Sequence, residues 1–421
     1  MIRDRDRRRA GNVPARADGM TATVAEVLGN YCREGSLHLM RRSSENAPSG
    51  MKKRFYIIVA ATLLLGSVLI SCNKDDDKKP SGSEVMQMTV ATGGNTSFSM
   101  NGTGTAIVEW GDGSINDTKS LIPDVEAGST KFDHNYSGAG TYTIKIYGEN
   151  VAALNCCGYE LTGLDVSRNT VLMYLDCSGS QLTTLDVSNN KALKLLSCGA
   201  CELTDLDVSK NTALTWLECG GNQLTDLDVS KNTALTELRC YANRLTKLDV
   251  SKNTTLTWLN CVDNQLTDLD VSKNHALTYL LCSENRLTDL DAGKNTALIE
   301  FSCFDNRLTN LDVSANRALV VLGCQRNQLS TLHVSNAGAL EILFCDGNQL
   351  TALDASTNTA LKTILCQNNQ FSANALNALF GTLHSNNVSG GKFISIKGND
   401  GTGNCDRSIA ANKGWIVNVT D

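Results

Sequence analysis

The segment LTYLLCSENRLTDLDAGKNTA, residues 277–297, is one copy of a unit that recurs every 21 residues along this chain of 421. Its first ten residues follow the pattern L-x-x-L-x-C-x-x-N-x, and its last eleven follow L-x-x-L-D-V-S-x-N-x-x with Ala and Gly in place of Val and Ser. The cysteine marks the repeat at a constant interval, at Cys156, Cys177, Cys198, Cys219, Cys240, Cys261, Cys282, Cys303, Cys324, Cys345 and Cys366. A period this strict predicts a solenoid in which each repeat forms one turn.

Seven small or apolar positions of each unit are predicted to face the interior. In residues 277–297 they are Leu277, Leu280, Cys282, Leu287, Leu290, Ala292 and Ala297. One turn alone cannot bury enough apolar surface to offset the entropy of ordering it, so neighbouring turns must stack into a continuous core. A turn of 21 residues also leaves no room for a regular helix. We therefore expect an elongated, weakly curved, mostly β solenoid of about ten to eleven turns over residues 151–370.

Asparagines recur in two columns beside the apolar positions. One column contains Asn222, Asn243, Asn264, Asn285, Asn306, Asn327, Asn348 and Asn369, and the other contains Asn169, Asn190, Asn211, Asn232, Asn253, Asn274, Asn295 and Asn316. An inward Asn can donate to carbonyl groups of the neighbouring turn that would otherwise be buried without a partner. Ser180 and Cys201 replace the Asn of the first column, which predicts an irregular N-terminal end of the solenoid.

An aspartate column stacks like charges from turn to turn. It contains Asp165, Asp186, Asp207, Asp228, Asp249, Asp270, Asp291 and Asp312, with His333 replacing the next Asp. Lysines run beside it at Lys210, Lys231, Lys252, Lys273 and Lys294, and they can offset the repulsion. The first interpretation is turn hydrogen bonding with this charge pairing, and the alternative is calcium bridging along the column.

The cysteine column is predicted to consist of free, buried thiols. Stacked inward side chains keep their Cβ atoms about 4.8 Å apart, whereas a disulfide requires about 3.5–4.5 Å. Scattered disulfides are the alternative for an exported chain. The motif Cys198-Gly-Ala-Cys201 could suggest zinc or redox chemistry, but Cys198 is simply a member of the column. We expect no metal site and no cofactor.

The unit resembles the 21-residue leucine-rich repeat of bacterial internalin-like proteins with a cysteine ladder, and that of Bacteroidetes surface proteins. The resemblance covers roughly residues 151–370 and is carried by the leucines, the cysteine and the two asparagines of each unit. It implies a rigid, non-enzymatic surface for recognition.

The segment before the repeats carries an export signal. Residues 51–71 have a basic start followed by an apolar run, and Leu69-Ile70-Ser71-Cys72 resembles a bacterial lipobox. This resemblance implies lipidation at Cys72 and an outer-membrane, cell-surface protein; an uncleaved membrane anchor is the alternative. Residues 72–84 are predicted to form a flexible charged tether that is similar to the surface-export signal of Bacteroidetes lipoproteins. Residues 1–50 are interpreted as a disordered leader or a wrongly assigned start.

Two smaller regions flank the repeats. Residues 85–150 contain short β-type runs, and the segment Trp110–Gly113 with the later H-x-Y and G-x-Y-x-I-x-I patterns resembles a PKD-type immunoglobulin-like sandwich. Asp112 and His134 are expected to have structural roles in its turns and strand ends. Residues 371–421 are predicted to form a small α/β cap, with helical spacing in residues 373–385 and strands at 392–397 and 415–419.

Charge and motif content argue against two functional classes. The net charge is −6, and it becomes −12 if residues 1–71 are removed, so nucleic acid is an unfavourable partner. The histidines after residue 71 are scattered, at His134, His275, His333 and His384. The sequence contains no nucleophile elbow or phosphate-binding loop, so we expect no catalytic residues and no enzymatic activity.

The first half of the repeat is predicted to carry the binding face. The outward residues of the second half hardly change between units, whereas those of the first half vary, and aromatic residues gather there. The candidate ligand-binding residues are Tyr174, Trp216, Glu237, Arg239, Tyr241, Trp258, Tyr279, Glu300 and Phe304. Exposed aromatics on a rigid sheet are typical of binding hot spots. We expect a monomer that binds a protein ligand; a surface glycan is the alternative because Trp and Tyr also suit sugar rings.

Overall fold

The computed structural model describes residues 84–124, 127–158 and 161–420. The predicted leader (1–50), signal peptide (51–71), lipidated Cys72 and nearly all of the tether (72–84) lie outside the described residues. Within the described part of the chain, no helix combines the length and apolar character needed to cross a membrane.

Eight strands of the described residues come first, and the last two belong to the first repeat. They are β1 (Glu84–Thr92), β2 (Asn95–Thr103), β3 (Thr105–Glu109), β4 (Asp117–Ser120), β5 (Thr130–Asn135), β6 (Gly140–Tyr147), β7 (Asn150–Asn155) and β8 (Leu161–Asp165). Strands β4-β3-β6-β1-β8 form one sheet, while β7-β2-β5 belong to a second, larger sheet. Alternate residues such as Met86, Met88 and Val90 are buried, as expected when one face of each strand covers a core.

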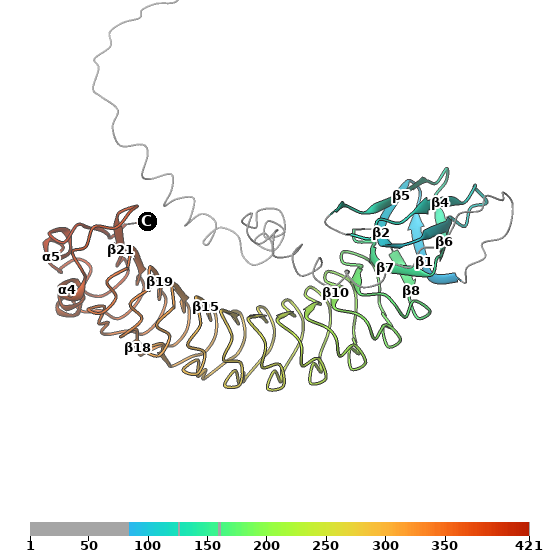
Figure 1. Ribbon diagram of the computed structural model, residues 1–421. Coiled ribbons are helices and arrows are strands. Elements are labelled where there is room, and N and C mark those ends of the chain that lie inside the picture. Colours follow the sequence, from blue (N-terminus) through green and yellow to red (C-terminus); the bar gives the residue numbers. More distant parts are fainter. Residues whose placement is uncertain (1–83, 125–126, 159–160, 421) are drawn as a thin grey trace, which may run out of the picture. The chain divides into compact units, whose positions relative to one another are not determined.

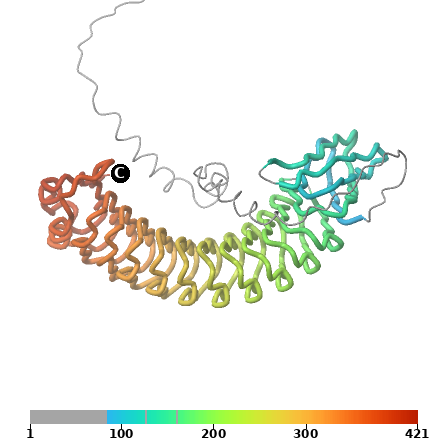
Figure 2. Tube along the Cα trace, in the orientation of Figure 1, coloured from blue at the N-terminus to red at the C-terminus, as the bar shows by residue number. Residues whose placement is uncertain are grey.

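The first half of each following repeat contributes one short strand. These strands are β9 (Tyr174–Asp176), β10 (Leu195–Ser197), β11 (Trp216–Glu218), β12 (Glu237–Arg239), β13 (Trp258–Asn260), β14 (Tyr279–Leu281), β15 (Glu300–Ser302), β17 (Val321–Gly323), β19 (Ile342–Phe344) and β20 (Thr363–Leu365). Neighbouring strands are parallel and pair in register, so a given position of every repeat forms a column. In Figure 1 the labels β10, β15 and β19 lie along the inner side of the curved stack of coils, and Figure 2 shows the same coils as a tube.

The predicted mostly β solenoid is confirmed, but the stack is longer than expected. In the part of the chain that the structure describes, thirteen parallel strands follow one another from β7 to β22, instead of ten to eleven turns. The difference arises at the C-terminal end. Strand β7 belongs to the first repeat and pairs parallel with β9, while β21 and β22 of the C-terminal segment continue the same sheet beyond β20.

The interior of the coils consists of columns of Leu, Val and Cys. Leu256, Leu259, Cys261, Leu266 and Val271 are all fully buried, and the same positions are buried in the other regular repeats. One expected inward position is wrong, because Ala297 is partly exposed while the fully buried Asn295 lies nearby. In this loop the side-chain amide of Asn295 faces the interior, and Ala297 does not.

The second half of each repeat has little regular structure. Among the described residues, β8 of the first repeat pairs there with β1, and β16 (Asn310–Asp312) and β18 (Thr331–His333) pair as a two-stranded parallel sheet. Elsewhere the chain follows turns whose polar groups are satisfied by the buried asparagines. The first-half strands therefore form the long parallel sheet of the described solenoid.

The C-terminal segment contains α4 (Ala373–Thr382), β21 (Lys392–Ser395), α5 (Ser408–Ala411) and β22 (Trp415–Asn418). Ser372 caps α4 by accepting from the backbone N–H of Ala375, and the helix buries Leu376, Leu379 and Phe380. Strands β21 and β22 add parallel strands to the sheet. The segment therefore covers the last regular turn with apolar side chains and extends the same ladder.

Candidate ligand-binding face

We define the strand face as the outward side chains of strands β9–β15, β17, β19 and β20 together with the residue after each cysteine. Outward residues alternate with the buried Leu or Phe at the centre of each strand. Register places Trp216 opposite Glu237, and Glu237 opposite Trp258. Tyr279 and Glu300 continue the column on the next two strands. The structure thus brings most of the candidate residues onto one surface.

A stack of aromatic and cationic side chains occupies the middle of the strand face. The guanidinium of Arg239 lies 5.6 Å from the ring centroid of Trp216 and 5.0 Å from that of Trp258. On its other side, Trp258 stacks on Tyr279 with 4.2 Å between ring centroids. Arg239 also donates to Glu237 at 3.2 Å. The ladder therefore holds four side chains in one preorganised pile, which lowers the entropy lost on binding.

Tyr241 is held beside this stack. Its hydroxyl donates to Glu218 at 3.0 Å, and burial raises the pKa of the phenol. The ring lies directly over Gly220, where an added Cβ would stand 2.6 Å from a ring carbon. Gly220 is thus the residue that lets Tyr241 lie flat on the sheet.

Tyr174 departs from the expected exposed strip. It is only 9% exposed and packs against Ala153, Met173 and Leu195 at the first turn. The preceding strand β7 pairs with β9 and supplies this cover, which the repeat pattern alone did not predict.

Phe304 and Glu300 lie further along the face. The guanidinium of Arg326 covers the Phe304 ring at 5.5 Å and pairs with Asp305. The carboxylate of Glu300 makes no hydrogen bond or ion pair with any described residue, and burial raises its pKa. The two acidic candidates of the column therefore differ, because Glu237 is paired with Arg239 and Glu300 has no such cation.

Apolar residues dominate the C-terminal half of the face, which the candidate set omitted. Val321 and Ile342 are half-buried in the same column, while Phe344 and Leu365 are buried. Ile416 on β22 is 62% exposed. The signal for them was the column of residues before the second Leu of each unit, which contains Val321 and Ile342 as well as the aromatic residues.

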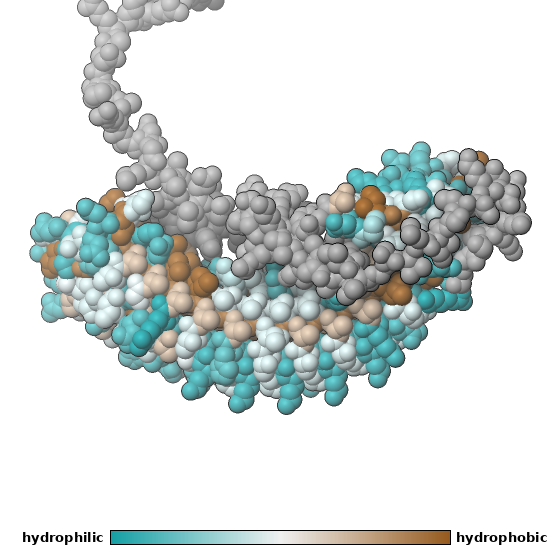
Figure 3. Space-filling view, viewed as in Figure 1, coloured by the Kyte–Doolittle hydropathy of each residue, from teal (hydrophilic) through white to brown (hydrophobic). Residues whose placement is uncertain are grey.

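The surface chemistry differs between the two halves of the repeat. Figure 3 shows hydrophilic residues along the protruding outer loops of the coils and a band of more hydrophobic residues beside them. The constant polar residues of the loops are explained by hydrogen bonding within the turns. The variation of residues on the strand face has no such explanation in the turn structure.

No protein-family model matches the chain, and no curated protein matches its sequence. Among solved structures, it is similar to the functional domain of InlJ from Listeria monocytogenes, described as including a cysteine ladder, with 33% identity and a TM-score of 0.49. That match covers 59% of this chain and 60% of the other, so the chain spans about three fifths of its length. An internalin from the same organism, inlF, matches with 19% identity and a TM-score of 0.50, covering 64% of this chain and 87% of that one.

The solenoid is a leucine-rich-repeat fold. Three features of the described chain identify this fold. They are the parallel sheet with one strand per turn, the inward leucines and the two columns of buried asparagines.

The eleven cysteines of the leucine-rich repeats form one buried column. Each is free and at most 2% exposed. Burial raises the pKa of these thiols, to about 12 for Cys240 and Cys366, except that a hydrogen bond with Cys201 is the main cause at Cys177. The thiols therefore stay protonated at neutral pH. They act as small apolar residues that fit the narrow interior.

Cys201 is a different kind of cysteine. It occupies the first asparagine column and donates to the carbonyl of Cys177 at 3.5 Å, the bond that Asn Nδ2 makes in later repeats. The hydroxyl of Ser180 lies 3.1 Å from its sulfur. Hydrogen bonds from the Cys177 thiol and Ser180 lower its pKa to about 6. Cys198 and Cys201 therefore belong to two separate columns.

The carboxylates of the aspartate column are hydrogen-bonded within their own turns. Asp228, Asp249 and Asp270 each accept the backbone N–H of the serine two residues later, at 2.8 Å. These bonds lower the pKa of the carboxyls. In the described ranges no group of three or more His, Cys, Asp or Glu could hold a metal ion.

Asp112 and His134 form a local pair in the N-terminal β region. They are 2.7 Å apart, and Asp112 also accepts the N–H of Ser114. The imidazole stacks on Trp110 at 4.7 Å between centroids. The pair thus links a turn to the end of β5.

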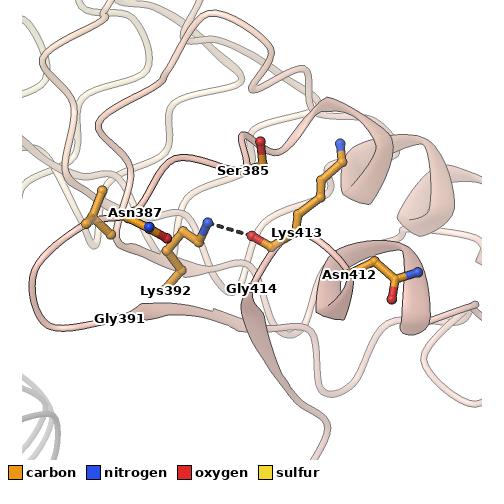
Figure 4. Close-up of a pocket in the computed structure, with 8 residues that line it drawn as sticks. Ser385, Asn387, Gly391, Lys392, Asn412, Lys413 and Gly414 are labelled. Carbon is orange, nitrogen blue, oxygen red and sulfur yellow. Dashed lines mark hydrogen bonds between the residues drawn. The ribbon is translucent and has the colours of Figure 1, made fainter.

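A shallow pocket in the C-terminal segment is built around Lys392 (Figure 4). This ammonium is buried and donates to the carbonyls of Asn386 at 2.8 Å, Lys413 at 2.6 Å and His384 at 3.4 Å. All three protons have partners, so the lysine cross-links loops of the segment.

Proposed function

We propose that the chain is a binding protein that recognises a protein ligand on the strand face of its leucine-rich repeats. The observation that carries this proposal is the stack of Trp216, Arg239, Trp258 and Tyr279. Aromatic and arginine side chains on a rigid support are the residues that contribute most to protein–protein affinity. Their positions are fixed before binding, so little ordering is required.

The geometry favours a protein over a glycan. Sugar rings bind by lying against an open aromatic face, but both faces of Trp258 are covered, one by Arg239 and the other by Tyr279. The edges of the rings remain for contact. Half-buried aromatic rings and flanking aliphatic side chains suit the mixed apolar and polar surface of a protein.

We further propose that the protein is lipid-anchored at Cys72 and displayed on the cell surface. The support is the lipobox-like segment Leu69–Cys72 after an apolar run. Labelling cells with a radioactive fatty acid should modify the wild-type protein and leave the Cys72→Ala variant unlabelled. Equal labelling of both proteins would refute this anchor.

The binding proposal is tested with two probes, a random peptide display library and a glycan array, against the full chain. Peptides should be selected that bind the wild type, and Trp258→Ala and Tyr279→Ala should each weaken them by about tenfold or more. Thr267→Ala, an exposed change in the second half of the repeat, is the matched control. Binding that is confined to glycans, or that ignores Trp258→Ala, would contradict the proposal.

A further inference from the structure

The ionised groups of the strand face are unequal in their partners. Glu237 is neutralised by Arg239 at 3.2 Å, and Glu218 accepts the hydroxyl of Tyr241 at 3.0 Å. Glu300 lies in the same column and makes no hydrogen bond or ion pair with any described residue. It is thus the acidic member of the column that the fold leaves uncompensated.

The surroundings of Glu300 are apolar on both sides. Register places Tyr279 opposite it on β14 and Val321 opposite it on β17. Both neighbours are half-buried, as Glu300 is itself. A carboxylate that loses water without gaining a donor is unfavourable, and a bound cation would remove this cost.

The next turn adds another acceptor. Gly323 on β17 has no side chain, and the amide oxygen of Gln325 lies over it, 3.3 Å from where a Cβ would stand. This oxygen is buried and has no hydrogen-bond partner within the described residues. On the same strand as Glu300, the hydroxyl of Ser302 is already engaged with Ser283 at 2.9 Å. The neighbouring turn therefore adds an unpaired acceptor oxygen over Gly323, two positions along from the partner of Glu300.

We propose that Glu300 is the cation-binding position of the strand face and receives a lysine or arginine side chain of the protein ligand. The cation would lie beside the Tyr279 ring, which adds a favourable cation–π contact. A neighbouring apolar residue of the ligand would cover Val321 and Ile342. A single carboxylate flanked by apolar groups suits such a side chain better than a hard metal ion, which needs six or more oxygens. The inference rests on the proposed function.

The test uses the full chain and the peptides selected from the random library. We expect a Lys or Arg at one fixed position of these peptides, next to an apolar residue. Glu300→Gln keeps the shape but removes the charge, and it should weaken the peptides by about tenfold or more. Asp268→Asn, which removes an exposed carboxylate from the second half of the repeat, is the charge-matched control and should bind as the wild type does.

A charge exchange makes the assignment specific. Glu300→Lys should abolish binding of the selected peptides, and peptides with Glu in place of their conserved Lys or Arg should restore it. Peptides that lose affinity with Trp258→Ala but bind Glu300→Gln unchanged would overturn this inference and leave the proposed function standing. A library that yields no peptide sensitive to Trp258→Ala would overturn both.

Discussion

At the scale of single residues, the two asparagine columns make different sets of hydrogen bonds. Asn264 donates to the carbonyl of Cys240 and accepts the backbone N–H of Leu245, both at 3.0 Å. Asn253 donates to the carbonyls of Val229 and Asn232, but its own side-chain oxygen is buried without a partner. Side chains of the first column therefore pair with both a backbone N–H and backbone carbonyls. Side chains of the second column pair with backbone carbonyls alone.

This difference predicts unequal costs of truncation. Asn264→Ala strands a buried N–H and a buried carbonyl, so it should lower the free energy of unfolding by about 2–4 kcal/mol. Asn253→Ala also removes an unsatisfied oxygen, and its cost should be smaller. Urea unfolding followed by circular dichroism measures both, with Thr267→Ala as the reference. A larger loss for Asn253→Ala would contradict the bonding pattern.

At the scale of the turn, the aspartates predict a pH dependence. Hydrogen bonds from the serine N–H hold the pKa of Asp228, Asp249 and Asp270 below the usual value in the folded chain. The stabilisation is then complete above the unfolded pKa, about 3.9, and is lost as the pH falls through the folded pKa. The melting temperature should fall between about pH 5 and pH 2.

The triple variant Asp228→Asn, Asp249→Asn, Asp270→Asn isolates this contribution. Asparagine keeps the side-chain carbonyl that accepts the serine N–H but does not titrate. The melting temperature of the triple variant should therefore fall less steeply with acid than that of the wild type. Asp346 acts in the opposite sense, since burial raises its pKa to about 6, but it is present in both proteins and its contribution cancels in the comparison. Parallel curves for the variant and the wild type would show that the column does not contribute.

A second feature of the turn explains what the repeat pattern could not predict. Two residues after each cysteine of the central repeats the backbone has a positive φ, for example 55° at both Asp263 and Glu284. Gly179, Gly221 and Gly347 occupy the same position, so comparing the units could have located it. A single unit such as 277–297 could not, because side chains other than Gly rarely adopt this conformation.

At the scale of the whole described molecule, the period alone predicted the solenoid, the inward leucines and the face that carries the aromatics. The C-terminal end was less predictable. Strands β21 and β22 lack the repeat pattern but pair with the same sheet, so the stack is longer than expected. Contacts between side chains on the strand face could not be predicted either. Glu237 is paired and Glu300 is not, and this difference depends on which variable side chains surround each of them.

A periodic stack further predicts that whole units can be removed but parts of units cannot. Deleting residues 256–276, one period of 21 residues, joins Thr255 to Leu277 with every column still in register. Because each turn contacts only its neighbours, this variant should remain folded and unfold cooperatively at a modestly lower temperature. Deleting residues 256–266 instead places polar residues of the second half where leucines belong, and the protein should lose its cooperative transition. Thermal unfolding followed by circular dichroism distinguishes the two variants, and equal damage from both deletions would mean that the turns are not interchangeable.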